Sequence, residues 1–248
     1  MDELNIALTI SYDGSCFHGF QRQPKARTVQ GCLEEALKPI VGHKLTIAGS
    51  GRTDTGVHAL GQVVNFKTKS LQVPLEKIKL LLNHSLNGEI TVRSVYTVPA
   101  DFHSRYSVKR KVYLYWVKTG ELEPWLRNYC WFWRKRSFDK TLVQRTAEIF
   151  LGEHDFAGFA ANLEPRTNTV KRLYSLEVTE NREGTIFTFE GDGFLRGMVR
   201  VLTSMLLHCG AGYIKPEALQ LQLSHPGKVN LPEKAPPNGL YLAKVIYT

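Results

Sequence analysis

Strand-like and helix-like segments alternate along the chain, and this alternation occurs twice. Residues 4–12 alternate apolar and polar side chains and end at Asp13-Gly14, which is typical of a strand that closes in a turn. Apolar residues at 3–4 spacing follow Thr28 and predict a capped helix over 28–40. The remaining predictions for the first half are strands at 45–48, 62–68 and 90–98, and a helix that begins at Pro74 and runs through Leu82.

The second half repeats this pattern with a different sequence. Its predicted elements are a strand at 112–117, a helix at 139–150, a hairpin of 170–179 and 185–190, a helix at 194–209 and a closing strand at 241–247. We therefore expect two α+β halves with antiparallel sheets, joined between about Ser104 and Lys111. The predicted domains are residues 1–106, which carry the Gly-rich segment described below, and residues 107–248.

The chain is basic. Its 248 residues contain 32 Lys and Arg against 23 Asp and Glu, a net charge of +9. A surplus of this size attracts polyanions, so nucleic acid is the first partner to consider, although many basic enzymes bind none. The four cysteines, Cys16, Cys32, Cys130 and Cys209, form no zinc-binding pattern. The sequence shows no signal-peptide pattern and no apolar run of about 20 residues. We therefore expect a cytoplasmic protein that does not enter a membrane.

A Gly-rich segment, residues 49–56, lies between two predicted strands and displays Asp54. Glycines there allow positive φ angles and a close approach to a ligand. A lone Asp in such a loop is more often a simple turn residue. Arg52, two residues before Asp54, favours a functional carboxylate because a nearby cation keeps it ionised and oriented. The segment is not a Walker A phosphate loop, since no Gly-Lys-Ser/Thr follows.

The positions of the other carboxylates limit the classes of reaction that the chain can catalyse. Asp13 and Asp192 each precede a glycine at a strand end and are most simply turn residues. The two carboxylates of glycosidases and the metal cage of nucleases are therefore weakly supported. The pair His154-Asp155 is interpreted as a capping or packing element rather than a metal site. We predict that the protein binds no metal.

Two arginines stand four residues apart in the predicted helix 194–209. This spacing places Arg196 and Arg200 on one helix face, and we expect Arg196 to be solvated. Arg200 lies among apolar residues, where an arginine usually has a carboxylate partner, and Asp54 is the obvious candidate.

Basic and aromatic residues are interleaved in three clusters, at 102–106, 109–115 and 131–136. Cations bind phosphates and aromatic faces stack on unpaired bases, so the three clusters together indicate RNA contact. Any one of these aromatics, taken singly, is more often a core residue. Tyr113 and Tyr115 face the same side of a strand, and we expect at least one of them to line a cleft.

Several sequence motifs of the chain resemble those of a known family. The segment Gly51–Ala59 reads GRTDTGVHA and is similar to the signature GRTDxGVHA of TruA-type tRNA pseudouridine synthases. The resemblance covers nearly the whole chain, although Asn87 stands where the family often has Pro and residues 119–137 match no motif. The other matching segments are 12–23, 28–30, 102–105, 113–115, 152–156, 193–200 and 239–242.

The resemblance implies both an activity and an architecture. Members convert uridine to pseudouridine at positions 38 to 40 in the anticodon stem-loop of tRNA, without a cofactor or metal. The implied fold is α+β, with two ferredoxin-like (RRM-like) halves that share a central, mainly antiparallel sheet around an active-site cleft. Members are homodimers. The atom that Asp54 attacks first, and the set of modified uridines, stay open.

The resemblance also implies roles for individual residues. Asp54 is the catalytic carboxylate, Arg200 its ion-pair partner and Tyr113 the ring that stacks on the target base, while Arg52 helps to flip that base. Two other classes remain as alternatives: an RNA-binding module without catalysis, and a hydrolase that releases free uracil. The residues expected to contact RNA are Arg22, His58, Arg105, Lys109, Arg110, Lys111 and Arg196.

Overall fold

The computed structural model describes residues 3–121, 123–135, 137–161, 163 and 167–248. It divides the chain into two compact units, each considered by itself below. The first unit is Met1–Lys109 with Tyr241–Thr248, and the second is Arg110–Leu240. Both units combine helices with mostly antiparallel strands, which confirms the α+β class.

The sheet of the first unit is built around β1 (Leu4–Tyr12). This strand lies between β4 (Ile90–Val98) and β3 (His58–Thr68), antiparallel to both. β2 (Ala48–Gly49) pairs with β3 on a short stretch, also antiparallel. β10 (Leu240–Ile246) runs parallel to β3, so the order across the unit is β4-β1-β3-β10.

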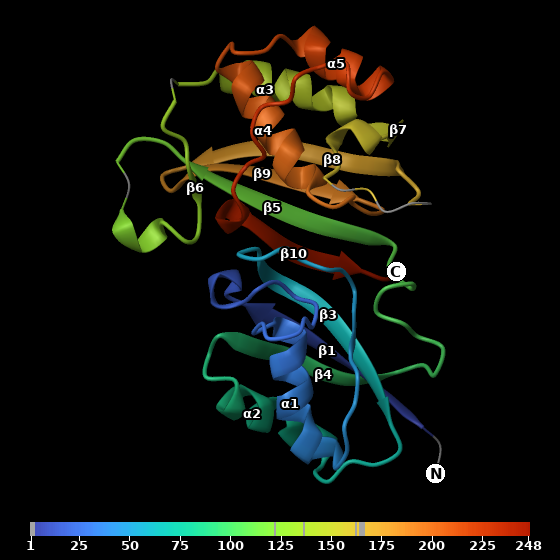
Figure 1. Cartoon of the computed structure of the whole chain (residues 1–248). Coiled ribbons are helices and arrows are strands. Elements are labelled where there is room, and N and C mark those ends of the chain that lie inside the picture. Colours follow the sequence, from blue (N-terminus) through green and yellow to red (C-terminus); the bar gives the residue numbers. More distant parts are fainter. Residues whose placement is uncertain (1–2, 122, 136, 162, 164–166) are drawn as a thin grey trace. The chain divides into compact units, whose positions relative to one another are not determined.

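Two helices cover one face of this sheet (Figure 1). α1 (Val29–Val41) begins where predicted, because the Thr28 side chain accepts a hydrogen bond from the amide of Gly31 (3.3 Å). α2 (Leu75–Ser85) packs beside α1 and against β4. Pro74 was predicted as its first residue, but Pro74 has an extended ψ of 145° and only flanks the helix.

The C-terminal strand belongs to the first unit. Tyr241 and Leu242 are in register with His58 and Ala59 of β3, and the amide of Lys109 donates to the carbonyl of Ile246 (2.9 Å). The chain thus returns to the first unit after completing the second, whereas the sequence-based division places residues 241–248 in the second half. The division into domains 1–106 and 107–248 stays a prediction.

The second unit contains further, mostly antiparallel strands. Its strands follow the order β5 (Arg110–Lys118), β9 (Gly184–Gly191), β8 (Val170–Asn181) and β7 (Gly152–Asp155). β6 (Trp131–Phe132) pairs with β5 in parallel. The strands β6 and β7 were not predicted, because two and four residues are too short for an alternating pattern to stand out.

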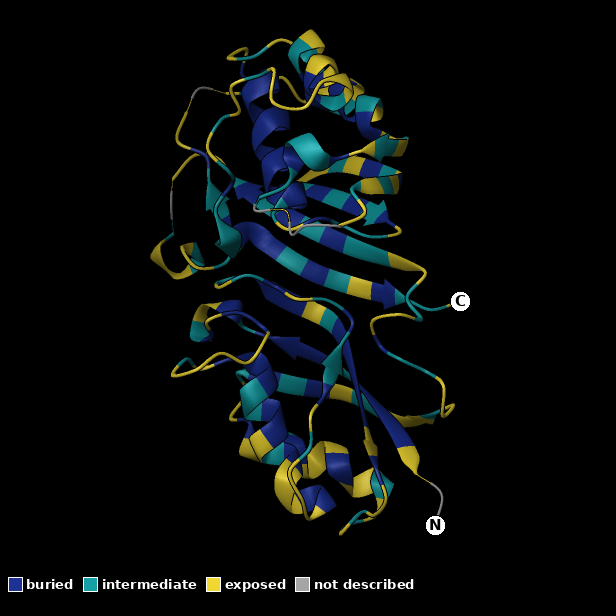
Figure 2. Ribbon diagram, turned by 45° about the vertical axis from the view of Figure 1, so that its right-hand side comes forward, coloured by how far each residue is buried: buried dark blue, intermediate teal, exposed yellow. Residues whose placement is uncertain are grey.

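The α-helices among the described residues of the second unit are α3 (Lys140–Ala147), α4 (Met198–Gly210) and α5 (Pro216–Ser224). α3 lies beside α4, and every residue of α4 is buried (Figure 2). α5 was missed because it is short and buries little beyond Leu219 and Gln222. Among the helices described, none has the length and apolar character required to cross a membrane.

The prediction that a helix starts at Phe194 was wrong by four residues. Gly197 adopts a left-handed conformation (φ +75°) immediately before α4, which interrupts any helix that comes from Phe194. Arg196 is therefore an exposed residue of the preceding turn. It does not share a helix face with Arg200.

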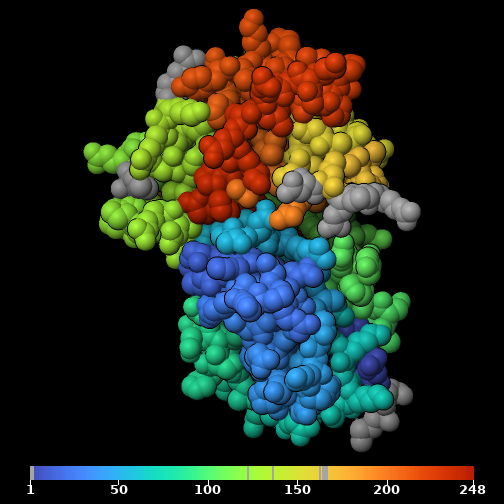
Figure 3. Space-filling view, viewed as in Figure 1, coloured from blue at the N-terminus to red at the C-terminus, as the bar shows by residue number. Residues whose placement is uncertain are grey.

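Residues 225–236 have no regular secondary structure and run over the surface of the second unit, in red in Figure 3. Side chains of α4 and β5 hold this segment by its carbonyl groups. The three bonds are Ser204 Oγ to Glu233 O (2.6 Å), Arg200 Nε to Ala235 O (2.6 Å) and Tyr115 Oη to Pro236 O (2.7 Å).

A buried histidine of α4 connects that helix to the segment after β6. His208 Nδ1 donates to Ser204 O (2.7 Å), so Nε2 carries the lone pair that accepts from Lys135 Nζ (2.8 Å). Burial lowers the pKa of His208 below its usual range, and the Lys135 ammonium lowers it further against the opposing effect of the Ser204 bond.

This lowered pKa predicts a loss of stability in mild acid. The unfolded chain takes up the His208 proton near pH 6.5 and the folded chain only at lower pH, so folding becomes less favourable as the pH falls below about 6.5. In His208→Gln the amide oxygen still accepts from Lys135 and nothing titrates. Urea unfolding at pH 7.5 and pH 5.5 should therefore show a smaller drop in free energy for this variant. An equal drop in both proteins would contradict the assignment.

Candidate active site

The loop of residues 50–57, called here the Asp54 loop, connects β2 to β3. Asp54 opens a β-turn in which the amide of Val57 donates to the Asp54 carbonyl (3.1 Å). Gly56 occupies the third turn position with φ +80°, which favours glycine. Asp54 is thus a turn residue, as the simpler interpretation expected. The residue is also partly exposed to solvent.

The start of the Asp54 loop is held from β3 by a fully buried side chain. Gln62 accepts a hydrogen bond from the Ser50 hydroxyl and donates from Nε2 to the carbonyl of Gly51 (2.8 Å). The amide of Ser50 also donates to the carbonyl of Val63 (2.8 Å). Two residues of β3 therefore fix the loop before it reaches Arg52.

The middle of the loop is held at Thr53. Its hydroxyl shares a hydrogen bond with the Tyr12 hydroxyl (2.8 Å), and its carbonyl accepts from the amide of Phe20 (3.1 Å). Both Tyr12 and Thr53 are buried. The residue next to Asp54 is thus fixed through its side chain and its backbone.

The segment of residues 13–20 packs directly on the Asp54 loop through glycines. A Cβ atom on Gly14 would lie 2.1 Å from the carbonyl oxygen of Val57, far inside contact distance. Gly19 combines φ +85° with an approach of 2.8 Å to the Thr53 carbonyl oxygen. Gly14 and Gly19 therefore allow the backbone of this segment to touch the backbone of the Asp54 loop.

His58 lies at the end of the Asp54 loop and is buried, with 2% of its surface exposed. Its Nδ1 accepts from the amide of Gly14 (3.0 Å) and lies 3.3 Å from Asp13 Oδ1, while its ring stacks on Tyr241 at 4.7 Å. Asp13 also caps the turn that follows it, through the Ser15 amide (3.0 Å), which confirms it as a turn residue. These contacts assign a structural role to His58, and its predicted RNA contact stays untested.

The four residues predicted to carry the reaction fall in both units. Arg52 and Asp54 share one loop, and Arg52 is exposed. Tyr113 lies on β5, buried, with its ring edge-on to Phe194 at 5.1 Å. Arg200 is 9% exposed, and its Nε atom donates to Ala235 O. The pairing of Arg200 with Asp54 and the stacking of Tyr113 on uracil stay predictions.

The basic residues predicted to bind RNA lie at the surface, apart from His58. Arg22 pairs with Glu34 (2.9 Å), and Arg110 pairs with Glu190 (3.0 Å) while its guanidinium lies 4.4 Å from the Tyr174 ring. The Arg110–Glu190 pair is largely exposed and such pairs are weak, whereas Glu34 in the other pair is buried. Of the others, Arg105, Lys109 and Arg196 are exposed and Lys111 is half-buried.

The aromatic cluster at 131–136 is partly a core element. Trp133 is 3% exposed, and its ring lies edge-on to Trp131 (5.1 Å) and to His208 (5.1 Å). Tyr115 is fully buried as well, with its hydroxyl bonded to Pro236. Arg136, which completes the cluster, lies outside the described residues.

The pair His154-Asp155 makes local bonds. His154 Nε2 donates to Leu151 O (2.8 Å), and Asp155 accepts from the Ala157 amide (2.9 Å). This agrees with the capping interpretation. In the described part of the chain, no three His, Cys, Asp or Glu side chains gather as metal ligands. That the protein works without a metal stays a prediction.

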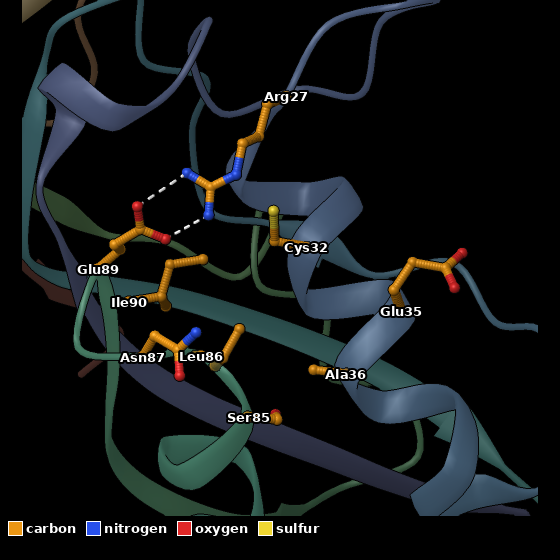
Figure 4. A pocket seen from close by; sticks show the side chains of 9 residues that line it. All are labelled: Arg27, Cys32, Glu35, Ala36, Ser85, Leu86, Asn87, Glu89 and Ile90. Carbon is orange, nitrogen blue, oxygen red and sulfur yellow. Dashed lines mark hydrogen bonds and ion pairs between the residues drawn. The ribbon is translucent and has the colours of Figure 1, made fainter.

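A pocket of about 270 Å³ lies between α1 and the turn that leads into β4 (Figure 4). Arg27 reaches across it to Glu89, with one bond at 3.1 Å, and lowers the pKa of the Glu89 carboxyl. No residue of the Asp54 loop lines this pocket. The pair ties the chain just before α1 to the start of β4, and it is separate from the candidate site.

Comparison with known proteins identifies the family. The sequence profile of the family described as tRNA pseudouridine synthase matches residues 8–107 and 146–248. The chain belongs to the tRNA pseudouridine synthase family. This confirms the resemblance and the prediction that the chain is an enzyme of the isomerase class. The Asp54 loop and α4 lie inside the matched ranges, whereas residues 108–145, with Tyr113, lie outside them.

Individual relatives align over almost their full length. A protein from Caldicellulosiruptor bescii named tRNA pseudouridine synthase A is 38% identical over 244 residues, which cover 98% of this chain and 99% of the relative. Proteins with the same name from Dictyoglomus thermophilum and Listeria welshimeri are 39% and 41% identical. Their alignments cover 98% and 96% of this chain, and 100% and 97% of the relatives.

The packing of Gly14 on the Asp54 loop predicts a large effect of one methyl group. In Gly14→Ala the new Cβ forces the two backbones apart, and we expect the free energy of unfolding to fall by about 1–3 kcal/mol or more. Gly193→Ala is the matched control, since its Cβ would meet only the flexible Lys171 side chain at 3.4 Å. Urea denaturation measures both. Equal stability of the two variants would refute the close approach.

Proposed function

We propose that this chain isomerises uridine to pseudouridine at positions 38 to 40 of the anticodon stem-loop of tRNA, with Asp54 as its catalytic carboxylate. The observation that carries the proposal is the geometry of the Asp54 loop. The carboxylate of a partly exposed residue stands on a backbone that is bonded at Gly51, at Thr53 and across the turn to Val57. A group held in this way needs little reorganisation when the substrate arrives.

The chemistry suits a single carboxylate. The bond between N1 of uracil and C1′ of ribose breaks, the uracil rotates, and a bond forms between C5 and C1′. The proton on C5 is then lost and N1 gains one, so the reaction needs no oxidant and consumes no water. Asp54 starts it by attacking the nucleotide or by removing a ribose proton. The base must leave its stack to reach the carboxylate, and Arg52 on the same loop assists this step.

The second unit supplies the partners of Asp54 in this proposal. Arg200 is a buried cation, and a buried guanidinium needs an anionic partner, which we assign to Asp54. Its Nε atom donates to Ala235 O, and in this proposal the terminal nitrogens bind the carboxylate. Tyr113 stacks on the flipped uracil. These assignments require the active site to lie in a cleft between the two halves.

The same proposal includes a ferredoxin-like arrangement of each half around a shared central sheet. In the first unit the chain order β1-α1-β2-β3-α2-β4, with β1 between β4 and β3 and β2 paired to β3, supports it. In the second unit, the β8–β9 hairpin followed by α4 supports it too.

Surface cations hold the tRNA backbone in this proposal, and the protein works in the cytoplasm as a homodimer. The residues that contact phosphates are Arg22, Arg105, Lys109, Arg110, Lys111 and Arg196. We give His58 the task of fixing the Asp54 loop, because its buried ring is already engaged by Gly14 and Tyr241. Family membership favours the isomerase over a binding module or a hydrolase.

Replacement of Asp54 tests the catalytic assignment. We expect Asp54→Ala to reduce tritium release from tRNA labelled with [5-³H]uridine by about a thousandfold or more, because no second carboxylate takes over its role. Binding of tRNA, measured by filter retention at fixed salt, should stay within a few-fold of the original protein. The exposed Asp101, replaced in Asp101→Ala, is the control and should retain activity. Substantial activity of Asp54→Ala would refute the assignment.

A further inference from the structure

Tyr12 connects the central strand of the first unit to the Asp54 loop. Its backbone is in register with Ala59, just after the loop, and with Ile90 on the other side of β1. The side chain is 5% exposed, and its hydroxyl meets the Thr53 hydroxyl at 2.8 Å. One residue is therefore anchored in the sheet at the end of the loop and bonded to the middle of the same loop.

Thr53 transmits this anchoring to Asp54 through a single peptide unit. The Thr53 carbonyl, which belongs to the peptide bond that leads into Asp54, accepts the Phe20 amide (3.1 Å). The Asp54 carbonyl is held in turn by the amide of Val57 (3.1 Å). With bonds on both sides, the position of the Asp54 Cα atom depends on where Thr53 is held.

We propose that Tyr12 is a positioning residue for catalysis: its hydroxyl fixes Thr53 and thereby places the Asp54 carboxylate. The inference rests on the proposed function of Asp54. Tyr12 itself does not touch the substrate in this account. A shift of about 1 Å in a catalytic group can cost about a hundredfold in rate, so one buried hydroxyl pair is sufficient to matter.

The test removes the hydroxyl from each side of the pair. We expect Tyr12→Phe and Thr53→Val each to lower kcat about ten- to a hundredfold, with KM for tRNA changed less than about twofold. The double variant should be no slower than the slower single variant, because both changes remove the same bond. Thr53→Ser keeps the hydroxyl and should recover most of kcat.

A matched control separates positioning from simple loss of stability. Thr68 is also buried and also bonded through its hydroxyl, to Ser70 O (2.8 Å), but it lies at the far end of β3. Thr68→Val should lose stability as Thr53→Val does and leave kcat unchanged. Independently of activity, hydrogen exchange at the Val57 amide should accelerate in Tyr12→Phe and not in Thr68→Val.

The outcomes distinguish this inference from the proposed function. Unchanged kcat in Tyr12→Phe, losses that multiply in the double variant, or unchanged exchange at Val57 would each overturn the role of Tyr12. Asp54→Ala is assayed beside these variants. If Asp54→Ala remains active, the proposed function fails. If it is inactive while Tyr12→Phe is fully active, only the positioning role fails.

Discussion

The candidate site depends on a backbone-to-backbone contact that only glycine permits. Residues 13–20 pack against the Asp54 loop at Gly14 and Gly19, and neither position has room for a methyl group. This contact allows the Phe20 amide to reach the Thr53 carbonyl and the Gly14 amide to reach His58. Without it, the loop would lose the Phe20 bond at Thr53 and the Gly14 bond at His58.

Buried polar side chains fix the position of the Asp54 loop at three points. Gln62 holds the start of the loop, Tyr12 holds its middle, and His58 holds its end against Tyr241. Each group makes at least one hydrogen bond inside the first unit, which offsets part of the cost of burying it. Tyr241 belongs to the last strand of the chain, so a residue far away in the sequence completes the packing around the loop.

The sequence predicted the elements of the fold best where a regular spacing of apolar residues extends over many residues. Periodicity predicted β1, α1 and β4 close to their true bounds, and the sequence motif singled out Asp54 and Arg52. The start of α4 was predicted at the wrong residue, because the spacing of apolar residues does not reveal that Gly197 adopts a left-handed conformation. Tyr12 and Gln62 were missed as loop contacts because in sequence they are ordinary strand residues. Their partners are set by register between strands, which one sequence does not reveal.

In the function proposed for this chain, a single, firmly placed carboxylate isomerises specific uridines. The most direct test is to incubate the protein with bulk tRNA that lacks pseudouridine and to map the products by mass spectrometry of digested fragments. We predict new pseudouridine at positions 38, 39 or 40, with no free uracil and no added cofactor. Free uracil with abasic sites, or tRNA that is bound and left unchanged, would contradict the account.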